Sequence, residues 1–599
     1  MHGRSSPTTP AGLQSLAALA WRRRFVAGLN LAIYAALLIW LAAILAPGGW
    51  TAPRLGIFFA FAVAAPWSVL GVCNAAIGFF LLRFHRDGLA ATAPYARAGD
   101  GDAPLSTRTA MLLTIRNEDP ARAFVRLRAM KESLDATGEG ERFDWFVLSD
   151  TNDFAIGAAE EEAFASLRIC AGACDAERIH YRRRAVNVGY KAGNIRDFCE
   201  RWGRGFDFMI PLDADSLMDG ETILRLVRIG EAFPRIGIVQ SLVVGAPSRS
   251  AFARLFQFGM RHGMRCYTMG AAWWAGDCGP FWGHNALVRV APFAEHCVLP
   301  QLEGDRHILS HDQIEAVLMR RAGFEVRVWP IESGSFEENP PTLLEFARRD
   351  LRWCEGNMQY ARLLGLPGLL PMSRFQLLWA ISMFVGAPAW TAIVALGALI
   401  PAIEDVSTFP GASAEVLYTT FFVFFLAPKL AGFADAALES GGLARYGGAR
   451  RFIASAALEV AGAFLIGAVT TLNVTIFLLG RLLFDRGLGW GAQLRDAHGL
   501  SLSDAARALW PHLLFGAATL ALGGAFAPRL LLWSLPLTLG YVAAIPFALA
   551  SASPRLGEWL TRLGLCATPE ELSRPEILRR LDGEETGERA LSRRAGAPA

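Results

Sequence analysis

Residues 206–219 read FDFMIPLDADSLMD, an apolar run that stops at Leu212 and is followed by Asp213, Asp215 and Asp219. A buried strand that delivers carboxylates to its C-terminal end is typical of the edge at which open α/β sheets hold their ligands. Because side chains alternate along a strand, both acids of Asp-Ala-Asp should point to the same side and offer hard oxygen ligands to a divalent cation. The pattern predicts a metal and diphosphate site, and it also fits a solvated turn or helix N-caps ahead of residues 220–229.

The composition predicts a membrane protein. The chain has 599 residues, of which 53% are hydrophobic, so it is too long for one core and more apolar than most soluble proteins. Its net charge of +3 is small for this length and does not indicate nucleic-acid binding. The nine cysteines include one close pair, Cys170 and Cys174, without a second pair at zinc-ligand spacing, which predicts reduced thiols.

Two apolar segments near the N-terminus predict membrane-spanning helices within residues 25–83. Residues 1–20 are rich in Ser, Thr, Pro, Gly and Ala without a long apolar run, and three arginines follow at residues 22–24, which predicts a flexible cytoplasmic N-terminus over residues 1–24. Residues 25–47 are uncharged and long enough to cross the hydrocarbon core, and residues 56–82 form a second such run. Basic residues follow the second run, so the chain should return to the cytoplasm.

Residues 84–370 predict a soluble α/β domain between the membrane segments. Strand-like runs at residues 110–115, 145–148, 206–212 and 236–239 alternate with helical patterns at residues 120–134, 158–170, 191–202 and 220–231. This alternation predicts parallel strands joined by right-handed crossovers, a Rossmann-like sheet. The first three strands are followed by Glu118, Asp150 and Asp213, so their ends should form a single crevice.

Residues 371–551 predict a second membrane region, followed by a charged cytoplasmic tail at residues 552–599. Four full spans are expected at residues 375–402, 416–433, 509–526 and 530–550. Residues 452–484 are also apolar but have basic loops on both sides, so this segment should enter and leave on the same side. A tight hairpin would do this, and one span plus an interfacial helix with a different topology is the alternative.

Basic residues upstream of the aspartates suit a diphosphate. Residues 181–195 read YRRRAVNVGYKAGNI, and a polyanion bridged through a metal would account for this basic segment beside an acidic pair. Lys191 is the better candidate for a phosphate contact, because the three consecutive arginines would also fit a membrane-facing surface. Downstream, Asp312 in Ser310-His311-Asp312 begins a helical pattern, where a carboxylate is either an N-cap or a general base.

Two aromatic segments complete the predicted site. Residues 281–285, FWGHN, combine aromatic and amide groups that suit a sugar subsite, and they also fit a packed turn. Residues 348–353, RRDLRW, lie on an amphipathic run at residues 343–364 just ahead of the membrane. An interfacial helix with snorkelling arginines is the alternative there, and it is favoured for Arg348.

This ordered set resembles the processive family 2 glycosyltransferases, the class of the cellulose and hyaluronan synthases. The lone Asp, the DxD, the TED-type base and the QxxRW helix of that family match Asp150, residues 213–215, Asp312 and residues 349–353. His311 and Arg349 stand where the family has Glu and Gln. The stretches RRDLRWCEGN, FWGHNALVRV, ILSHD, KAGNIRDFC and LDADSLM resemble a narrower group, the glucans biosynthesis glucosyltransferase H enzymes of osmoregulated periplasmic glucan synthesis, over about residues 105–485.

The resemblance implies an α/β GT-A catalytic domain in the cytoplasm, inserted between transmembrane helices of the bacterial inner membrane. It implies inverting transfer of glucose from UDP-glucose to a growing, chiefly β-1,2-linked glucan that is exported to the periplasm. Asp312 would be the base, and Asp213 and Asp215 would hold Mg²⁺ or Mn²⁺. The implied donor-binding residues are Glu118, Asp150, Lys191, Asn194, Asp213, Arg349 and Arg352, and the acceptor-binding residues are Phe281, Trp282, His284, Asn285 and Trp353. A periplasmic glucan-processing partner and an acyl carrier protein are implied as well.

Three other functions fit parts of the sequence. One is a cellulose-like β-glycan synthase, and another is a transferase that moves a sugar onto a lipid phosphate without polymerising it. The third is a polysaccharide transporter with a regulatory nucleotide-binding domain. Few ionisable residues lie within the predicted spans, Lys429 and Glu459 being exceptions, and there is no internal repeat, so the transporter is the least favoured.

Overall fold

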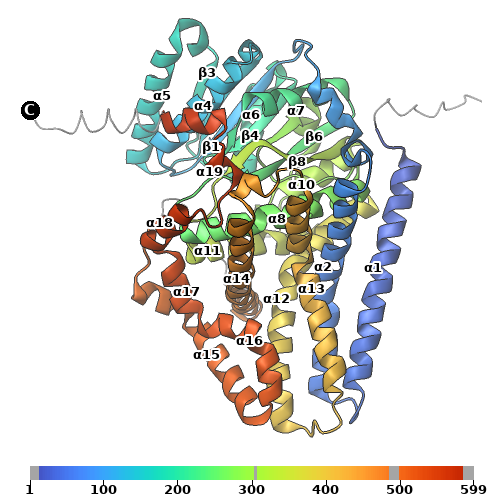
Figure 1. The fold of residues 1–599 in the computed structure, drawn as a ribbon. Coiled ribbons are helices and arrows are strands. Elements are labelled where there is room, and N and C mark those ends of the chain that lie inside the picture. The colour runs from blue at the N-terminus through green and yellow to red at the C-terminus, as the bar shows by residue number, and fades with distance from the viewer. Residues whose placement is uncertain (1–12, 303–306, 485–497, 584–599) are drawn as a thin grey trace, which may run out of the picture.

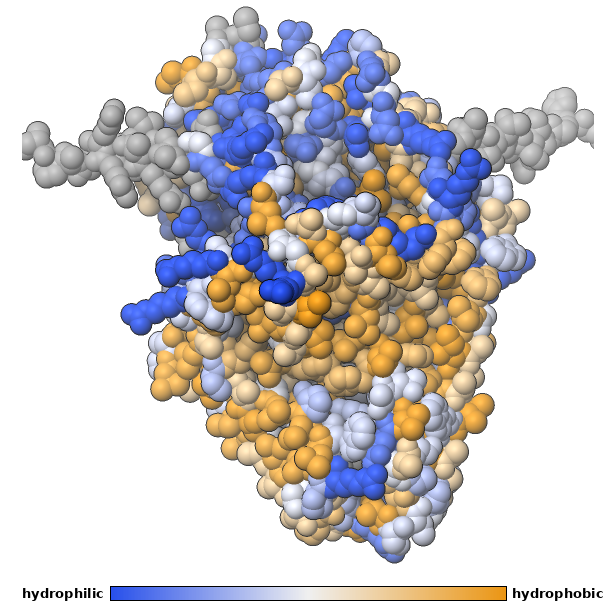
Figure 2. Space-filling view, viewed as in Figure 1, coloured by the Kyte–Doolittle hydropathy of each residue, from blue (hydrophilic) through white to orange (hydrophobic). Residues whose placement is uncertain are grey.

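The computed structural model describes residues 13–302, 307–484 and 498–583, which form an α/β domain seated on a bundle of long helices (Figure 1). Hydrophilic side chains cover the α/β domain, whereas a broad apolar belt covers much of the helices on the face seen in Figure 2. Such a belt is the surface that a bilayer requires. The surface of the α/β domain is therefore suited to aqueous solvent, and the belt around the helices is suited to the hydrocarbon core of a membrane.

Eight strands form the central sheet in the order β3-β2-β1-β4-β7-β6-β8-β5. Strands β1 to β4 pair in parallel, as predicted, whereas β7 runs antiparallel between β4 and β6, and β5 runs antiparallel to β8. All four predicted strands therefore run in the same direction, as expected, and the sequence analysis missed only the strands between and beside them, of which the antiparallel β5 and β7 have two and four residues and leave no periodic signal. The strands are β1 (Thr109–Ile115), β2 (Phe143–Ser149), β3 (Ile179–Arg183), β4 (Phe208–Asp213), β5 (Leu217–Met218), β6 (Ile236–Gly245), β7 (Ala286–Arg289) and β8 (Glu325–Glu337).

Helices cover both faces of the sheet. Side chains of β1 alternate between two apolar clusters, with Met111 and Leu113 in one and Ala110 and Leu112 in the other. The first cluster includes residues of α4 (Pro120–Asp135), α5 (Phe154–Ala176) and α7 (Gly220–Ala232). The second includes residues of α6 (Tyr190–Arg201), α9 (Val290–His296) and α10 (Asp312–Arg321).

Six helices of the described chain are long and apolar enough to cross a membrane. They are α1 (Leu16–Leu45), α2 (Ala52–Arg83), α12 (Pro371–Ile403), α13 (Gly411–Leu438), α14 (Ala449–Phe484) and α15 (Leu502–Phe526). A seventh span is possible if the bent pair α16 (Pro528–Val542) and α17 (Ala544–Ser551), with a 59° bend, is counted as one. Two further helices, α8 (Ala251–Ala275) and α11 (Leu343–Met358), pack between the sheet and the bundle.

The segment at residues 452–484 lies within one continuous helix, so the predicted hairpin is wrong. Nothing in its sequence breaks the helix, since α14 contains no proline. Near its beginning, Phe452 packs with Tyr446 and Cys566, and near its end Arg481 donates to Glu355 of α11 at 2.6 Å. Both ends of α14 therefore contact the side of the bundle that carries the α/β domain.

Both ends of the described chain are more ordered than the sequence analysis predicted. Helix α1 already begins at Leu16, capped by Ser15, and includes the three arginines. After α18 (Pro554–Leu563), α19 (Pro569–Leu572) places Glu570 and Glu571 in ion pairs with Arg261 and Arg254 of α8. The C-terminal charges were predicted to lie in a solvated cytoplasmic tail. Glu570 and Glu571 instead form ion pairs with buried arginines of α8.

Candidate functional site

The carboxyl ends of β1, β2 and β4 lie side by side and carry the predicted acids. Strand β1 pairs in parallel with both neighbours, and Thr114 lies opposite Asp213. Glu118 and Asp150 follow the ends of β1 and β2, and Asp215, which is only 8% exposed, follows β4. This register assembles the predicted crevice at one edge of the sheet.

Gly283 is the point at which residues from three elements meet. Lys191, near the start of α6, pairs with Asp213 and donates to the Gly283 carbonyl at 2.9 Å. A Cβ built on Gly283 would lie 3.3 Å from Cβ of Asp312, 3.7 Å from Cε1 of His311 and 3.9 Å from Nζ of Lys191. Its φ of +80° also favours glycine. The predicted lysine, the first aspartate of the DxD and the SHD carboxylate thus surround one residue.

His311 and Asp312 differ in their surroundings. Asp312 is the first residue of α10, and His311 occupies the N-cap position without a capping hydrogen bond from its side chain. His311 Nδ1 lies 2.9 Å from Oε2 of Glu315. Burial disfavours the charged imidazolium, but the carboxylates of Glu315 and Asp312 outweigh this and raise the pKa of His311. At any given pH a larger fraction of His311 therefore carries its second proton than for an ordinary histidine.

Glu337 is an acid of this site that the sequence analysis missed. It ends β8 with its Oε2 3.5 Å from His284 Nε2. Burial raises the pKa of Glu337, His284 and Arg349 oppose this shift, and Asp215 and Asp213 add to it. The strand was hidden in the sequence because Pro330 interrupts it, so the acid at its end had no apolar run to mark it.

The predicted basic segment is neutralised by carboxylates of its own domain. Arg184 forms a two-pronged pair with Asp150 at 2.7 and 2.6 Å, and Arg182 pairs with Asp197 at 2.8 Å. Asn194 is 1% exposed and donates to the Leu148 carbonyl at 2.9 Å. A direct contact between Asn194 and a nucleotide sugar, as predicted, does not fit this burial.

The predicted acceptor residues divide into two groups. Phe281 is 1% exposed in the core against α10, and Asn285 is fully buried and donates to Ser335 Oγ at 3.0 Å. Direct sugar contacts by these residues do not fit their burial. Trp282 and His284 are partly exposed, and Trp353 is 45% exposed, so these side chains retain surface for a ligand.

Helix α11 presents the RRDLRW residues on different sides. Arg348 is exposed and pairs with Glu345. The guanidinium of Arg349 lies 4.7 Å from the ring centroid of Trp353, and it acts on the carboxyl of Glu337. Arg352 is half-buried, and burial raises the pKa of Asp350 to about 6, although Arg349 opposes the shift. The electrostatics therefore connect Arg349 of this helix to the crevice.

The donor set at the crevice suits a cation that shares its coordination with a ligand. Asp219 caps α7, accepting from Thr222 N at 2.7 Å, which leaves Asp213 and Asp215 as the pair. In the part of the chain that the structure describes, no group of three or more His, Cys, Asp or Glu side chains forms a complete metal site. Two carboxylates plus phosphate oxygens are the set that Mg²⁺ commonly accepts, so these residues fit such an ion.

Comparisons with known proteins agree with this geometry. A model of the glycosyl transferase family group 2 matches residues 208–430. Glucans biosynthesis glucosyltransferase H of Xanthomonas campestris pv. campestris (strain B100) is 36% identical, covering 96% of this chain and 90% of the relative. The proteins of the same name from Vibrio cholerae serotype O1 (strain ATCC 39541 / Classical Ogawa 395 / O395) and Rhodopseudomonas palustris (strain BisA53) are 34% and 37% identical, each covering 93% of this chain and 78% of its own length.

A solved mannosyltransferase from Pyrobaculum calidifontis, in complex with GDP-Man and Mn²⁺, is 14% identical and covers 62% of this chain and 98% of its own, with a TM-score of 0.38 that supports no conclusion. The family match and the sheet topology give an α/β GT-A glycosyltransferase fold flanked by apolar helices. With this identity to its relatives over most of both chains, the protein belongs to the glucans biosynthesis glucosyltransferase H family, whose members are glucan-synthesising glycosyltransferases.

Proposed function

We propose that this protein polymerises glucose from UDP-glucose into the β-linked, chiefly β-1,2 backbone of osmoregulated periplasmic glucans. The catalytic domain would lie in the cytoplasm and the helical bundle would export the product across the inner membrane. The observation that carries the proposal is the convergence of Lys191, Asp213 and Asp312 around Gly283 in a chain of this family. That arrangement places a cation, a DxD acid and a candidate base within one small volume.

The donor is held on the strand-end side of the crevice. Asp213 and Asp215 would bind Mg²⁺ or Mn²⁺, which when present neutralises charge on the diphosphate leaving group. Lys191, which forms an ion pair with Asp213, would contact the phosphates. Arg349 and Arg352 would approach the phosphates from α11. Glu118, at the end of β1, would hold the nucleoside, and Asp150, which is 3% exposed and paired with Arg184, would act on it through that arginine.

The acceptor reacts on the α10 side of the crevice. Asp312 would take the proton of the acceptor hydroxyl as its oxygen attacks the anomeric carbon from the face opposite UDP, so the configuration inverts. The raised pKa of His311 argues for Asp312 as the proton acceptor, because a base must be unprotonated at the working pH. Trp282, His284 and Trp353 would contact the acceptor sugar. A periplasmic glucan-processing protein and an acyl carrier protein remain proposed partners, by family resemblance.

Product analysis with the purified full chain tests this proposal. With UDP-[¹⁴C]glucose and Mg²⁺ or Mn²⁺, we expect polymeric label whose linkage analysis gives mainly 2-linked glucose, and chelator should abolish it. The Asp215→Asn variant should fold and insert but make almost no polymer. Label in a lipid-soluble monosaccharide product would indicate transfer to a lipid phosphate, 4-linked polymer would indicate a cellulose-like synthase, and no incorporation would favour a transporter.

A further inference from the structure

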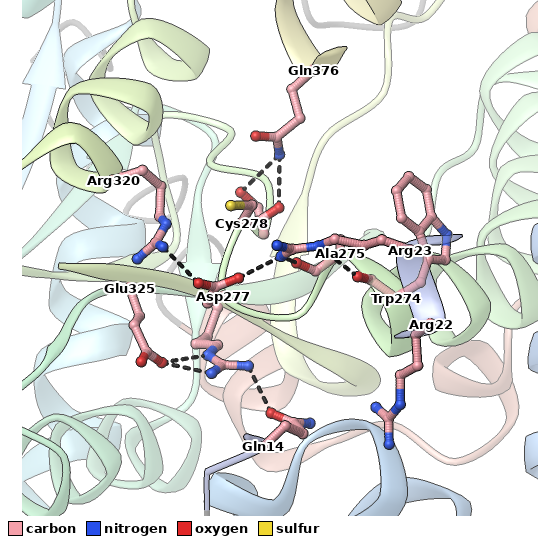
Figure 3. A network of polar contacts seen from close by, with 12 residues as sticks. Gln14, Arg22, Arg23, Trp274, Ala275, Asp277, Cys278, Arg320, Glu325 and Gln376 are labelled. Carbon is pink, nitrogen blue, oxygen red and sulfur yellow. Dashed lines mark hydrogen bonds and ion pairs between the residues drawn. The ribbon is translucent and has the colours of Figure 1, made fainter. Parts of the chain in front are cut away.

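Asp277 is a buried carboxylate outside the crevice, at the point where α1, α8 and α10 meet (Figure 3). Its side chain is 5% exposed and pairs with two cations. Oδ2 of Asp277 lies 2.6 Å from Nη2 of Arg320, in the last turn of α10, and Oδ1 pairs with Arg23 of α1. The donor and acceptor sites proposed above use none of these residues.

The start of α1 is fastened to the end of α8 directly beside Asp277. Arg22 Nη1 donates to the Trp273 carbonyl at 3.0 Å, and Arg23 Nη2 donates to the Ala275 carbonyl at 2.6 Å. Cations at a helix C-terminus satisfy its last carbonyls and interact favourably with the helix dipole. The first membrane helix therefore binds the last turn of α8, which ends two residues before Asp277.

The chain that follows Asp277 leads straight to the crevice. Gln376 of α12 donates to the Cys278 carbonyl at 2.7 Å (Figure 3). Gly279 N donates to the Val326 carbonyl of β8 at 2.6 Å. Four residues later, Gly283 contacts Lys191 and lies against Asp312. Residues 277–279 thus connect two membrane helices and the sheet to the loop that bears Gly283.

Helix α10 carries the proposed base at one end and the Asp277 partner at the other. Asp312 is its first residue, and Arg320 is the last but one. Between them, Ile314 and Val317 are buried in one cluster with Phe281 of the Gly283 loop. Because a ten-residue helix moves as a unit, a shift at Arg320 is transmitted to Asp312.

We propose that Asp277 is a positioning residue for glucosyl transfer: by pairing at once with Arg320 of α10 and Arg23 of α1, it sets the position of Asp312 relative to Gly283 and to the membrane helices. The inference rests on the proposed role of Asp312 as the base. Burial alone would favour a protonated Asp277, but Arg320 and Arg23 outweigh it and lower the pKa of this carboxyl. The pairs of Asp277 with Arg320 and Arg23 are therefore charged at neutral pH.

The Asp277→Asn variant of the full-length protein tests whether the pairs of Asp277 with Arg320 and Arg23 position Asp312. We expect kcat to fall by about 10- to 100-fold, the scale of a small misplacement of a reacting group, with the KM for UDP-glucose little changed. Asp175→Asn is the matched control, because Asp175 also joins two cations, Lys131 and Arg178, away from the crevice. This control should retain the wild-type rate. A KM effect alone, or equal losses in both variants, would contradict the proposal.

A second arm separates positioning from general damage. In an Asp312→Asn background, Asp277→Asn should change the residual rate little, because its effect passes through Asp312. A further drop in kcat as large as in the wild type would contradict the positioning role of Asp277. A near-normal rate for Asp312→Asn alone would instead contradict the role of Asp312 as the base. If Asp277→Asn does not fold, Arg320→Lys and Arg320→Gln give the same test: the lysine variant should retain most of kcat and the glutamine variant should not.

Discussion

Gly283 shows how closely single residues control the geometry of this site. Its carbonyl accepts a hydrogen bond from Lys191. A Cβ added to its Cα would lie only 3.3 Å from Cβ of Asp312, so the backbone and this side chain are already close together. The nearby Glu337 adds a buried negative charge to those of Asp213 and Asp215. The backbone of Gly283 thus approaches Asp312 closely, and the carboxylates of Asp213, Asp215 and Glu337 lie near one another. A bound cation would offset their mutual repulsion.

Replacing Gly283 by alanine should abolish most transfer. The added Cβ would press on Asp312 at 3.3 Å, and the φ of +80° is strained for any residue with a Cβ. Gly138→Ala is a matched control, since Gly138 has a φ of +84° with nothing within 4 Å of the added atom. Thermal unfolding should show a loss of about 1 kcal/mol from the left-handed φ in both variants and a further loss from the Asp312 contact in Gly283→Ala, whereas only Gly283→Ala loses activity. Equal activities would show that Gly283 does not separate Lys191 from Asp312.

Glu337→Gln should stabilise the folded protein at neutral pH. The pKa of Glu337 is raised, so the folded state binds its proton more tightly than the unfolded state, and the stability from this proton is lost as pH rises through the raised value. The gain in melting temperature over wild type should therefore grow from acidic to neutral pH. Glu338→Gln should destabilise instead, because Glu338 pairs with Arg122 at 2.8 Å and also with Arg126. A gain that is independent of pH would contradict this assignment.

At the scale of elements, the sequence predicted what local pattern determines and missed what tertiary partners determine. Strands β1, β2 and β4 and the long apolar helices have the periodicity or length that marks them. Helix α8 was missed, and its Arg254 and Arg261 are buried because Glu571 and Glu570, more than 300 residues away in the sequence, neutralise them. The motifs likewise predicted that Lys191 and Asp312 share one crevice, and both lie beside Gly283, but adjacency within a motif says nothing of side-chain direction, so the burial of Phe281 and Asn285 was not foreseen.

The path of α14 can be tested by reporter fusions. Because both ends of this helix contact the side of the bundle that carries the α/β domain, fusions after Arg451 and after Phe484 should both report the cytoplasm. The two fusions should behave alike in alkaline phosphatase and fluorescent-protein assays. A periplasmic signal after Phe484 alone would mean that α14 crosses the membrane completely and that the later helices are inverted.

Across the whole molecule, α8 joins the membrane bundle, the sheet and the C-terminal segment. Arg261 pairs with Glu332 of β8 at 2.5 Å and with Glu570 at 2.7 Å, and Leu578 is buried in the cluster that covers one face of the sheet. The C-terminal segment is thus part of the folded structure and completes the charge balance between the catalytic domain and the bundle.

Truncation after Ala567 should therefore destabilise the whole protein. It removes Glu570 and Glu571 and leaves Arg261 and Arg254 as buried cations with fewer partners, a change that costs about 3–5 kcal/mol per broken pair. A chain that ends at Gly583 keeps these pairs and should melt near the wild-type temperature. Thermal unfolding in detergent compares the two, and equal melting temperatures would show that this segment contributes nothing to stability.

Turnover of UDP-glucose by the Asp312→Asn variant tests the proposed transfer site most directly. Removing a base that acts only in the transition state should lower kcat by about 10²- to 10⁴-fold and leave UDP affinity nearly unchanged. His311→Ala, measured beside it, should be the milder change, since the raised pKa of His311 leaves less of its imidazole unprotonated and available as a base. An Asp312→Asn enzyme that polymerises at a near-normal rate, together with an inactive His311→Ala enzyme, would contradict the assignment and make the histidine the base.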